Sequence, residues 1–391
     1  MLTNLWYVAE WSNKVTTKPV KVKLLGQNFV LFRDSKGKVS CLSDICIHRG
    51  ASLAGGKTTK RDCVACPYHG WEFNGEGKVA FIPSRGEGAD VPQRARVDAY
   101  PTEERYGMIW VFLGDLPEEE RYPIPPFPEF EDRKNWRPIY TQFDWTGSVD
   151  RVVENGIDIA HTAFVHPGFG YPEMADKNHI ASIEATESSG ASSCVLYPPQ
   201  LEGNLGLMRF ARRDKAETHV HPGFYLSGHC VRLHIQINAW METIIFDANT
   251  PIDENHTRSF VVQLRNFFKW GIFDKGSVKR TQKVFGEDAA IVEALSPNYL
   301  PETLQTEVSV EQDRFMNAWR RVRKVHIDKG WKVDSKAMEP FAGEKVFTIP
   351  SPARRTNPEI PWALETVPLV PPVTNPRRAA EQEQELESRS A

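Results

Sequence analysis

The sequence lacks the features that mark membrane-spanning, secreted or nucleic-acid-binding proteins. No run of about 18 apolar residues occurs in it, so we expect no membrane-spanning helix. Residues 1–7 contain neither a basic stretch nor an apolar core, so we expect no signal peptide. The net charge of −3 gives no reason to expect binding to nucleic acid or to a membrane surface.

Cysteines are few, and nucleotide-binding motifs are absent. Six cysteines in a chain of 391 residues do not form a disulfide framework, which favours a reducing compartment, and we expect the cytoplasm. The sequence has no G-x-G-x-x-G segment and no flavin motif, so we do not expect the chain to oxidise NAD(P)H itself. Its length exceeds that of one typical core, and two domains are therefore expected.

The sequence does contain two short stretches that each combine a cysteine, a histidine and a following glycine. Cys46 and His48 lie in the first stretch, and Cys66 and His69 lie in the second. Seventeen residues separate His48 from Cys66, which is enough for a short hairpin that brings the two loops together. Two cysteines and two histidines, with both histidines on one iron, form the Rieske arrangement. We therefore expect these four residues to bind a [2Fe–2S] cluster.

A structural zinc ion is the alternative for the same residues. Cys63 and Cys66 form a C-x-x-C pair, which is a common zinc-binding spacing. Zinc bound there would leave His69 without a role and would make the similarity of the two loops a coincidence. The cluster is therefore favoured, and Cys41 and Cys63 are expected to be buried thiols in strands.

The N-terminal part of the chain is predicted to be all-β. Residues 20–42 and 108–113 have strand-like runs on either side of the two loops, so residues 1–120 are expected to form one small domain. Prolines among acidic residues mark 121–138 as a linker.

The pattern changes after this linker. Strands are expected at 231–240, 243–246 and 258–264, and helices at 147–166, 279–295 and 307–325. We interpret 139–349 as an α+β domain in which helices pack against an antiparallel sheet. Residues 350–391 are expected to be a proline-rich and then polar tail that is partly disordered.

A second group of candidate ligands lies near the start of this second domain. Glu154, Asp158 and His161 have the spacing of residues on one helix face. His161 and His166 are five residues apart, which an ideal helix would splay by about 140°. A π-type turn or a helix end would let both reach one ion, and Pro167 favours the helix end.

Two histidines and one carboxylate form the facial triad of non-haem Fe(II) oxygenases, which leaves positions open for O₂ and substrate. The best candidate for the carboxylate is Asp288, because it lies on the apolar face of its predicted helix. A buried carboxylate is costly unless it is paired or binds a metal. Glu287 is the runner-up, and Glu293 and Asp313 are weaker candidates.

Residues 1–325 resemble the α subunit of Rieske non-haem iron oxygenases. The resemblance is carried by the Asn-Leu-Trp-Tyr start, both cysteine–histidine loops, the Asp-x₂-His-x₄-His segment and Phe-Gly-Glu-Asp at 285–288. It implies that His161, His166 and Asp288 bind the catalytic Fe(II), which uses O₂ as co-substrate. It also implies a helix-grip catalytic domain, a ring of three subunits, and Asp158 as the link to the cluster of the next subunit.

Within this family the run at 313–321 resembles the α₃-type monooxygenases and demethylases and the pheophorbide-oxygenase-like branch. The expected function is a terminal oxygenase that takes electrons from a reductase or ferredoxin. It would mono- or dihydroxylate, or oxidatively demethylate, an apolar, cyclic or aromatic small molecule. Similarity to carbazole-type α₃ dioxygenases is the alternative within the family. Asn155 is a candidate polar contact near the iron, and Ile157, Phe164 and 231–240 are candidate walls of a substrate pocket.

Two other functions fit parts of the sequence. A Rieske electron carrier fused to a binding domain would need no second iron, so the histidine–carboxylate triad argues against it. A ligand-binding protein with a degenerate iron site is disfavoured, because candidates for all three iron ligands are present.

Overall fold

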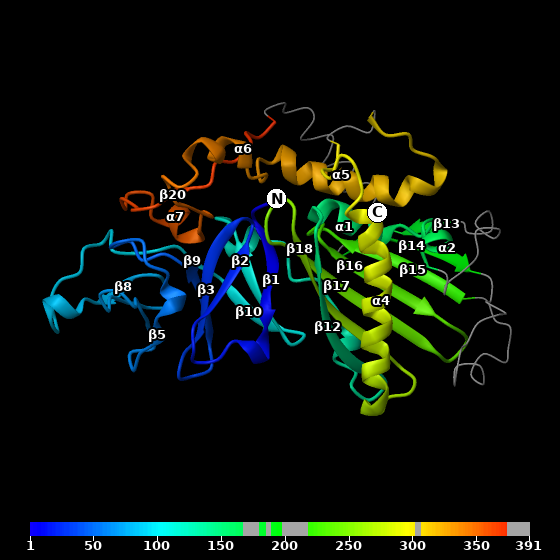
Figure 1. Ribbon diagram of the computed structural model, residues 1–391, viewed down its shortest axis with the longest axis horizontal. Coiled ribbons are helices and arrows are strands. Elements are labelled where there is room, and N and C mark those ends of the chain that lie inside the picture. Colours follow the sequence, from blue (N-terminus) through cyan, green and yellow to red (C-terminus); the bar gives the residue numbers. More distant parts are fainter. Residues whose placement is uncertain (167–179, 185–188, 198–217, 302–305, 374–391) are drawn as a thin grey trace. The chain divides into compact units, whose positions relative to one another are not determined.

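The computed structural model describes residues 1–166, 180–184, 189–197, 218–301 and 306–373. These residues form two compact units (Figure 1). The first unit contains Met1–Ile124, Pro251–Glu254 and His326–Val373, and the second contains Pro125–Thr250 and Asn255–Val325.

Short antiparallel sheets make up most of the first unit. One sheet contains β2 (Val20–Leu24), β3 (Gln27–Arg33), β4 (Val39–Ser43) and β9 (Ala99–Tyr100). Another contains β1 (Leu5–Trp11), β11 (Met108–Leu113) and β10 (Thr102–Arg105). A third contains β5 (Lys57–Thr58), β6 (Val64–Ala65), β7 (Glu72–Phe73) and β8 (Val79–Phe81). The prediction of an all-β N-terminal domain is therefore confirmed.

Continuous apolar runs explain where the core of this unit lies. Every residue of β11 is buried, as expected for a strand that is covered on both faces. A separate cluster packs Val30, Leu53 and Phe73 around the cysteines Cys46 and Cys66. The two cysteine–histidine loops are therefore built directly on a hydrophobic core.

The C-terminal segment belongs to the first unit, contrary to the expected domain boundary at residue 349. Its elements are α6 (Ser335–Met338), β19 (Phe347–Thr348), α7 (Pro352–Thr356) and β20 (Glu365–Thr366). Asp98, a fully buried carboxylate, accepts hydrogen bonds from Arg354 (2.7 and 2.8 Å) and Ser351 (2.7 Å). Tyr100 donates to the Ile349 carbonyl (2.7 Å). The segment packs here because it supplies partners for buried polar groups. The predicted disorder of the tail concerns 374–391, which lie outside the described residues.

A seven-stranded sheet dominates the second unit, in the order β12-β18-β17-β16-β15-β14-β13. The strands are β12 (Arg137–Trp145), β13 (Ile180–Glu184), β14 (Ser189–Tyr197), β15 (Thr218–Tyr225), β16 (Cys230–Gln236), β17 (Glu242–Pro251) and β18 (Thr257–Arg265). Helix α1 (Val149–Ile157) packs on β15 and β16, and α4 (Asp274–Val292) packs on β12 (Figure 1). Helix α5 (Arg314–Asp328) packs against α1 through Phe315 and Trp319. The predicted α+β class is confirmed.

Several predicted elements differ in extent from the observed ones. The strand expected at 231–240 ends at Gln236, because the Asn238 side chain accepts hydrogen bonds from the backbone of Trp240 and Met241 and forms a turn. Helix α4 begins at Asp274 rather than at 279. The helix expected from 307 begins at Arg314.

The segment expected to be a linker, 121–138, is packed rather than free. The two units divide between Ile124 and Pro125, and β12 already begins at Arg137. Phe127 is buried and stacks on Phe246 of the sheet, with ring centroids 5.0 Å apart. The proline-rich segment is therefore packed against the core of the second unit.

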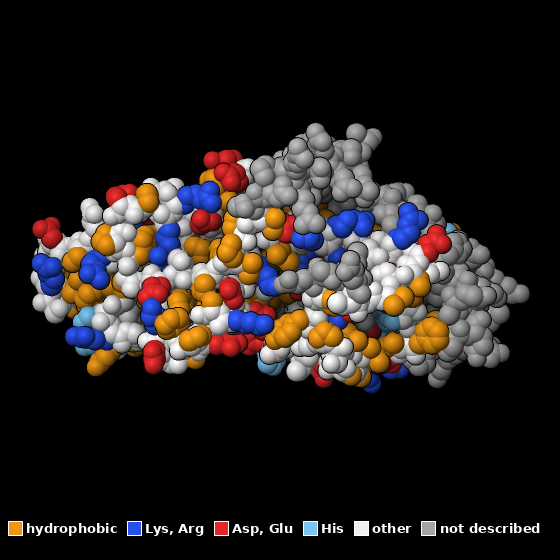
Figure 2. Space-filling view, turned by 90° about the horizontal axis from the view of Figure 1, so that it is seen from above, with side chains coloured by type: hydrophobic (Ala, Val, Ile, Leu, Met, Phe, Trp, Pro, Cys, Tyr) orange, Lys and Arg blue, Asp and Glu red, His pale blue; other side chains and the backbone are white. Residues whose placement is uncertain are grey.

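The described surface has no large area of one charge sign on the face drawn in Figure 2, where basic, acidic and hydrophobic side chains are interspersed. None of the described helices is long and apolar enough to cross a membrane.

Replacing Arg354 with Ala should destabilise the protein by about 3 kcal/mol, because it leaves the buried Asp98 without its cation. Urea unfolding measures this loss. Arg355→Ala is the matched control, because Arg355 pairs with Asp115 at the surface (3.3 Å) and its loss should cost about 0.5 kcal/mol or less. Equal destabilisation by both variants would contradict the structural role of the Asp98 pair.

Candidate metal centres

The two cysteine–histidine loops have the same backbone hydrogen bonds. The Gly50 N–H donates a hydrogen bond to the Cys46 carbonyl (2.8 Å), and the Cys46 N–H donates one to the carbonyl of Ala51, the residue after the glycine (2.7 Å). Gly70 and Cys66 repeat this pattern at 3.0 and 2.9 Å. Both glycines have positive φ angles (76° and 69°), which side chains with a Cβ atom rarely adopt. Each glycine thus closes a tight loop that presents one cysteine and one histidine.

The side chains of the two loops converge. Cys46 and Cys66 are buried, and burial, with the neighbouring Cys66 thiol, raises the pKa of Cys46 to about 11. The rings of His48 and His69 have centroids 4.6 Å apart, and Trp71 stacks on His48. Nδ1 of His48 is buried and has no hydrogen-bond partner among the described residues. Two facing thiols and an imidazole nitrogen without a partner fit the donor set that a Rieske cluster requires.

The remaining cysteines near this site behave as buried neutral thiols. Burial raises the pKa of Cys63 to about 11, and its Sγ atom donates to the Arg61 carbonyl (3.3 Å). Cys41 lies fully buried in β4, where burial raises the pKa of its thiol. Their expected burial is confirmed, but Cys63 lies just before β6 (Val64–Ala65) and not in a strand as expected.

The second group of candidate ligands begins where α1 ends. Helix α1 stops at Ile157, and Asp158 has an extended conformation (φ −75°, ψ 134°). One Asp158 oxygen accepts a hydrogen bond from the Ala160 N–H (2.8 Å), and the other lies 3.3 Å from Nδ1 of His161. The prediction that Glu154, Asp158 and His161 share a helix face is therefore wrong. A turn at the helix end brings Asp158 and His161 together instead.

The short helix α2 (Thr162–Val165) separates the two histidines. His166 follows it in an extended conformation (φ −113°, ψ 91°), as expected for the residue before Pro167. The helix end that the sequence favoured over a π-type turn is confirmed. It lets both imidazole rings face the same point, with centroids 5.3 Å apart.

The two histidines converge on Asp288 of α4. Oδ1 of Asp288 lies 3.3 Å from Nε2 of His161 and 3.0 Å from Nε2 of His166. In the described part of the chain, this is the group of three whose ligand atoms all lie within 4.8 Å of one another. Neighbouring ligands about 2.1 Å from one octahedral ion lie about 3 Å apart. The observed spacing therefore fits a metal ion with little movement of the side chains.

The other nitrogen of each histidine contacts a carboxylate. Nδ1 of His161 faces Asp158, and Nδ1 of His166 lies 2.9 Å from Glu287. An N–H at Nδ1 leaves the lone pair of Nε2 available to a metal. Glu287, the runner-up candidate ligand, thus lies behind His166 rather than beside Asp288.

The protonation of this site is set by burial and by mutual hydrogen bonds. Burial lowers the pKa of His161, but hydrogen bonds with Asp158 and Asp288 outweigh it and raise the pKa to about 9. Burial raises the pKa of Asp288, but His161 and His166 outweigh it, and the net shift is downward. Without a metal, protons on the imidazoles therefore balance the buried carboxylate. A divalent cation would replace those protons, so the residues fit such an ion.

The two weaker carboxylate candidates lie elsewhere. Glu293 is exposed and accepts a hydrogen bond from the Thr146 N–H (3.3 Å). Asp313 accepts from the Val310 N–H (2.8 Å) at the start of α5. Asn155, by contrast, donates to Oδ1 of Asp288 (3.3 Å), so this predicted polar contact lies at the site.

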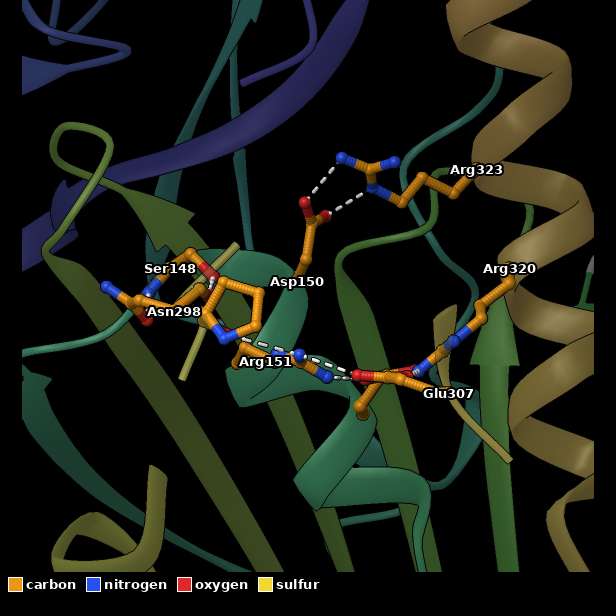
Figure 3. Close-up of polar contacts among 9 residues, drawn as sticks. Ser148, Asp150, Arg151, Asn298, Glu307, Arg320 and Arg323 are labelled. Atoms are coloured by element: carbon orange, nitrogen blue, oxygen red, sulfur yellow. Dashed lines mark hydrogen bonds and ion pairs between the residues drawn. The ribbon is translucent and has the colours of Figure 1, made fainter. Parts of the chain in front are cut away.

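A network of ion pairs fixes α1 against α5 (Figure 3). Arg151 of α1 contacts Glu154 (3.1 Å) and Glu307 (2.8 Å). Arg320 of α5 contacts the same two carboxylates, at 2.7 Å for Glu307. Asp150 and Arg323 form a further pair between the helices, also drawn in Figure 3. Because Asn155 follows on the next turn of α1, this network positions the helix end from which the site is built.

The two units also match two protein-family models. The Rieske [2Fe-2S] domain matches residues 5–101, and the vanillate O-demethylase oxygenase C-terminal domain matches 145–329. Aminopyrrolnitrin oxygenase PrnD from Pseudomonas fluorescens is 34% identical over 265 residues, which cover 64% of this chain and 71% of that protein. The chain is a Rieske-type oxygenase. The cofactors of this family are a Rieske [2Fe–2S] cluster and a mononuclear iron that uses O₂.

Other comparisons agree with this assignment. Methylxanthine N1-demethylase NdmA from Pseudomonas putida is 25% identical over 335 residues, or 82% of this chain and 88% of that protein. Chlorophyllide a oxygenase from Chlamydomonas reinhardtii is 38% identical over 310 residues, which are 74% of this chain but 43% of that protein. The solved structure of Pseudomonas putida CBB5 NdmB has a TM-score of 0.69 at 22% identity, covering 83% of this chain and 91% of that one. The predicted fold is thereby confirmed.

The two residues proposed from the sequence as walls of a substrate pocket in this Rieske-type oxygenase differ in burial. Ile157 is 1% exposed and packs in the core between α1 and α5. Phe164 is 63% exposed. Sequence reasoning missed the partner role of Glu287 and the Arg151–Arg320 network. Charged residues at helical spacing usually face solvent, so the sequence held no signal that these would be buried together.

Replacing His161, His166 or Asp288 with Ala should lower the iron content from about three to about two per chain, because the [2Fe–2S] cluster remains. Metal analysis with visible and EPR spectra measures both centres. Glu287→Gln should keep the ligands but weaken iron binding by about 10- to 100-fold, because it removes the partner of His166. His48→Ala is the reciprocal control, which should lose the cluster alone. Full mononuclear iron in Asp288→Ala, with loss in Glu287→Ala, would reverse the assignment of the two carboxylates.

Proposed function

We propose that the chain is a terminal oxygenase that hydroxylates or oxidatively demethylates an apolar, cyclic or aromatic small molecule. The observation that carries this proposal is the convergence of His161 and His166 on Asp288, with both Nδ1 atoms facing carboxylates. When bound, the cluster supplies single electrons and the mononuclear iron activates O₂. An external ferredoxin or NAD(P)H-dependent reductase provides the electrons, because the sequence contains no nucleotide-binding motif of its own.

The residues of the site have separate tasks in this proposal. His161, His166 and Asp288 hold the iron on one side and leave the other side open to O₂ and substrate. Asp158 and Glu287 orient the two imidazoles. Oxidation at a carbon bonded to nitrogen or oxygen would release that carbon as an aldehyde, which is the chemistry of demethylation.

The names of related proteins support a cyclic substrate. Aminopyrrolnitrin oxygenase, two methylxanthine demethylases and the structure of dicamba monooxygenase bound to dicamba all concern ring compounds. A Rieske electron carrier is the alternative function, but an electron carrier does not require the buried histidine–carboxylate site. We also propose a cytoplasmic location, since a thiolate-bound cluster is stable in a reducing compartment.

A single experiment separates an oxygenase from an electron carrier. The protein with its cluster and iron is supplied with NADH and a surrogate reductase under ¹⁸O₂, with a panel of arenes, N-methyl heterocycles and methyl ethers. We expect ¹⁸O in a hydroxylated product, or formaldehyde in step with a demethylated one. Fast reduction of the cluster without any oxygenated product, in protein with a full complement of iron, would favour the carrier.

We further propose that the chain assembles as a ring of three, in which Asp158 connects the iron site to the cluster of a neighbouring subunit. Asp158 keeps 25% of its side-chain surface exposed while it contacts His161. His69, at the tip of the second cysteine–histidine loop, is exposed as well. A carboxylate between these two imidazoles would orient both and provide a short path for the electron.

Asp158→Asn should keep the cluster and the oligomer but slow electron transfer, measured per bound mononuclear iron, by more than about tenfold, because the amide is a poorer partner for two imidazole N–H groups. Single-turnover oxidation of the reduced cluster by O₂ with substrate measures this rate. Glu287→Gln, which changes the partner of the other histidine, is the matched control, and its rate is compared per bound mononuclear iron because this variant is expected to bind iron more weakly. An undiminished rate in Asp158→Asn, or a fully active monomer, would show the connection to be wrong.

A further inference from the structure

A buried carboxyl group that neither metal centre uses lies on the sheet below α1. Asp247 is on β17, directly across from Val231 of β16. Val231 packs on Val153 and Ile157 of α1, and residues paired across strands point to the same side of a sheet. The side chain of Asp247 therefore lies on the face that the helices cover, where the residue is 8% exposed.

A second set of contacts gives the same position. Oδ2 of Asp247 lies 3.5 Å from the hydroxyl of Ser259, which accepts a hydrogen bond from the Trp145 indole (2.9 Å). Trp145 packs against Val292 of α4. Asp247 thus lies between the strands covered by α1 and by α4, the two helices that meet at Asp288.

This carboxyl group lacks good partners. Oδ1 of Asp247 has no hydrogen-bond partner among the described residues. The hydroxyl of Ser259 is shared, because it also donates to Oδ1 of Asn249. Nδ2 of Asn249 is itself buried without a partner in the same part of the chain. Oδ1 of Asp247 and Nδ2 of Asn249, an acceptor and a donor two residues apart on one strand, are thus buried without a hydrogen bond of good geometry, although the Asn249 side chain is near enough to lower the pKa of Asp247.

The charge state of Asp247 agrees with this environment. Burial raises the pKa of Asp247 to about 7, against smaller opposing effects of Ser259 and Asn249. Within the described residues, no Lys, Arg or His forms an ion pair with it. Burial therefore favours the neutral form of this carboxyl group relative to an exposed one, and a neutral carboxyl group can donate as well as accept a hydrogen bond.

Apolar surface lies next to this polar pair. Ile245, two residues before Asp247 on the same face of β17, pairs with Leu233 of β16. Both side chains remain partly exposed, although helices cover this side of the sheet. Leu233 also packs with Ile159, which lies two residues before His161. An apolar floor thus extends from the carboxyl group toward the iron site.

We propose that Asp247 is the substrate-recognition residue of this oxygenase, binding an N–H or O–H group of a neutral cyclic substrate together with the Asn249 amide. The ring of the substrate lies over Leu233 and Ile245. This inference rests on the oxygenase function proposed above. Substrates with a carboxylate or sulfonate are disfavoured, because the pair offers no positive charge to balance them.

Binding of matched probes to the anaerobic protein, loaded with cluster and iron, tests the proposal without turnover. The probes are indole, 1-methylindole and indole-3-carboxylate, with phenol, anisole and benzoate as a second set. We expect the probe with a free N–H or O–H to bind up to about tenfold more tightly than its methylated counterpart, as one hydrogen bond allows. The anionic probes should bind most weakly. Asp247→Ala should remove the preference, whereas Asp144→Asn, which alters an exposed carboxylate of the same sheet, should keep it.

Stability provides a measurement that needs no ligand. Asp247→Leu should melt at the same or a higher temperature than the wild type, because it removes a buried polar group that the fold does not satisfy. A clear fall in melting temperature would show that Asp247 is a structural residue, for example one bound to an internal water, and would overturn the proposal. Unchanged selectivity in Asp247→Ala, equal or tighter binding of the anionic probes, or no binding of either donor-bearing probe would overturn it as well.

The two proposals fail in different ways. Failure of the oxygenase function would appear in the wild type, as protein that holds its cluster but no mononuclear iron or yields no ¹⁸O product. Failure of the recognition proposal would leave iron content and oxygenation intact and would show only in the probe series.

Discussion

The arrangement of the catalytic unit depends on one oxygen atom, Oδ1 of Asp288. It lies within 3.3 Å of Nε2 of His161, Nε2 of His166 and Nδ2 of Asn155, which come from three separate positions around the end of α1. A carboxylate this deeply buried is tolerated only with several donors or a cation. The same contacts with Asp288 therefore join α1 to α4 and build the site. The ion pairs of Arg151 and Arg320 fix the position of α1.

The sequence predicted the ligands better than it predicted the backbone that carries them. Cysteine and histidine spacing indicated both sites, and the apolar neighbours of Asp288 indicated its burial. The sequence does not reveal the helix break at Asp158. No proline or glycine causes it; instead, the Asp158 side chain accepts a hydrogen bond from the backbone N–H of Ala160, two residues further on. The sequence predicts a tail for the C-terminal segment, because prolines at short spacing do not reveal that Arg354 has a buried partner far away in the sequence, Asp98.

Buried charges in this protein fall into two kinds. The network of Asp150, Glu154 and Glu307 with three arginines balances its charges within the described structure, so its role is to fix helices. The group around Asp288 is balanced by imidazoles whose protons a metal ion can replace. A buried polar group that the described fold leaves without a partner becomes a candidate for binding something else where other observations point to the same place.

Asp288 and Asp247 illustrate this distinction within one layer of the protein. Both carboxyl groups lie between the sheet and the helices, and burial alone would raise the pKa of each. Two histidines reverse that effect at Asp288 and keep it ionised, as a cation ligand must be. Among the described residues, no cation does so at Asp247, where burial raises the pKa to about 7. Environments that shift the pKa values of two carboxyl groups in opposite directions suit them to different chemistry. The ionised group binds a cation, and the neutral group forms hydrogen bonds with uncharged partners. The same layer can therefore hold a metal ion and select an uncharged substrate beside it.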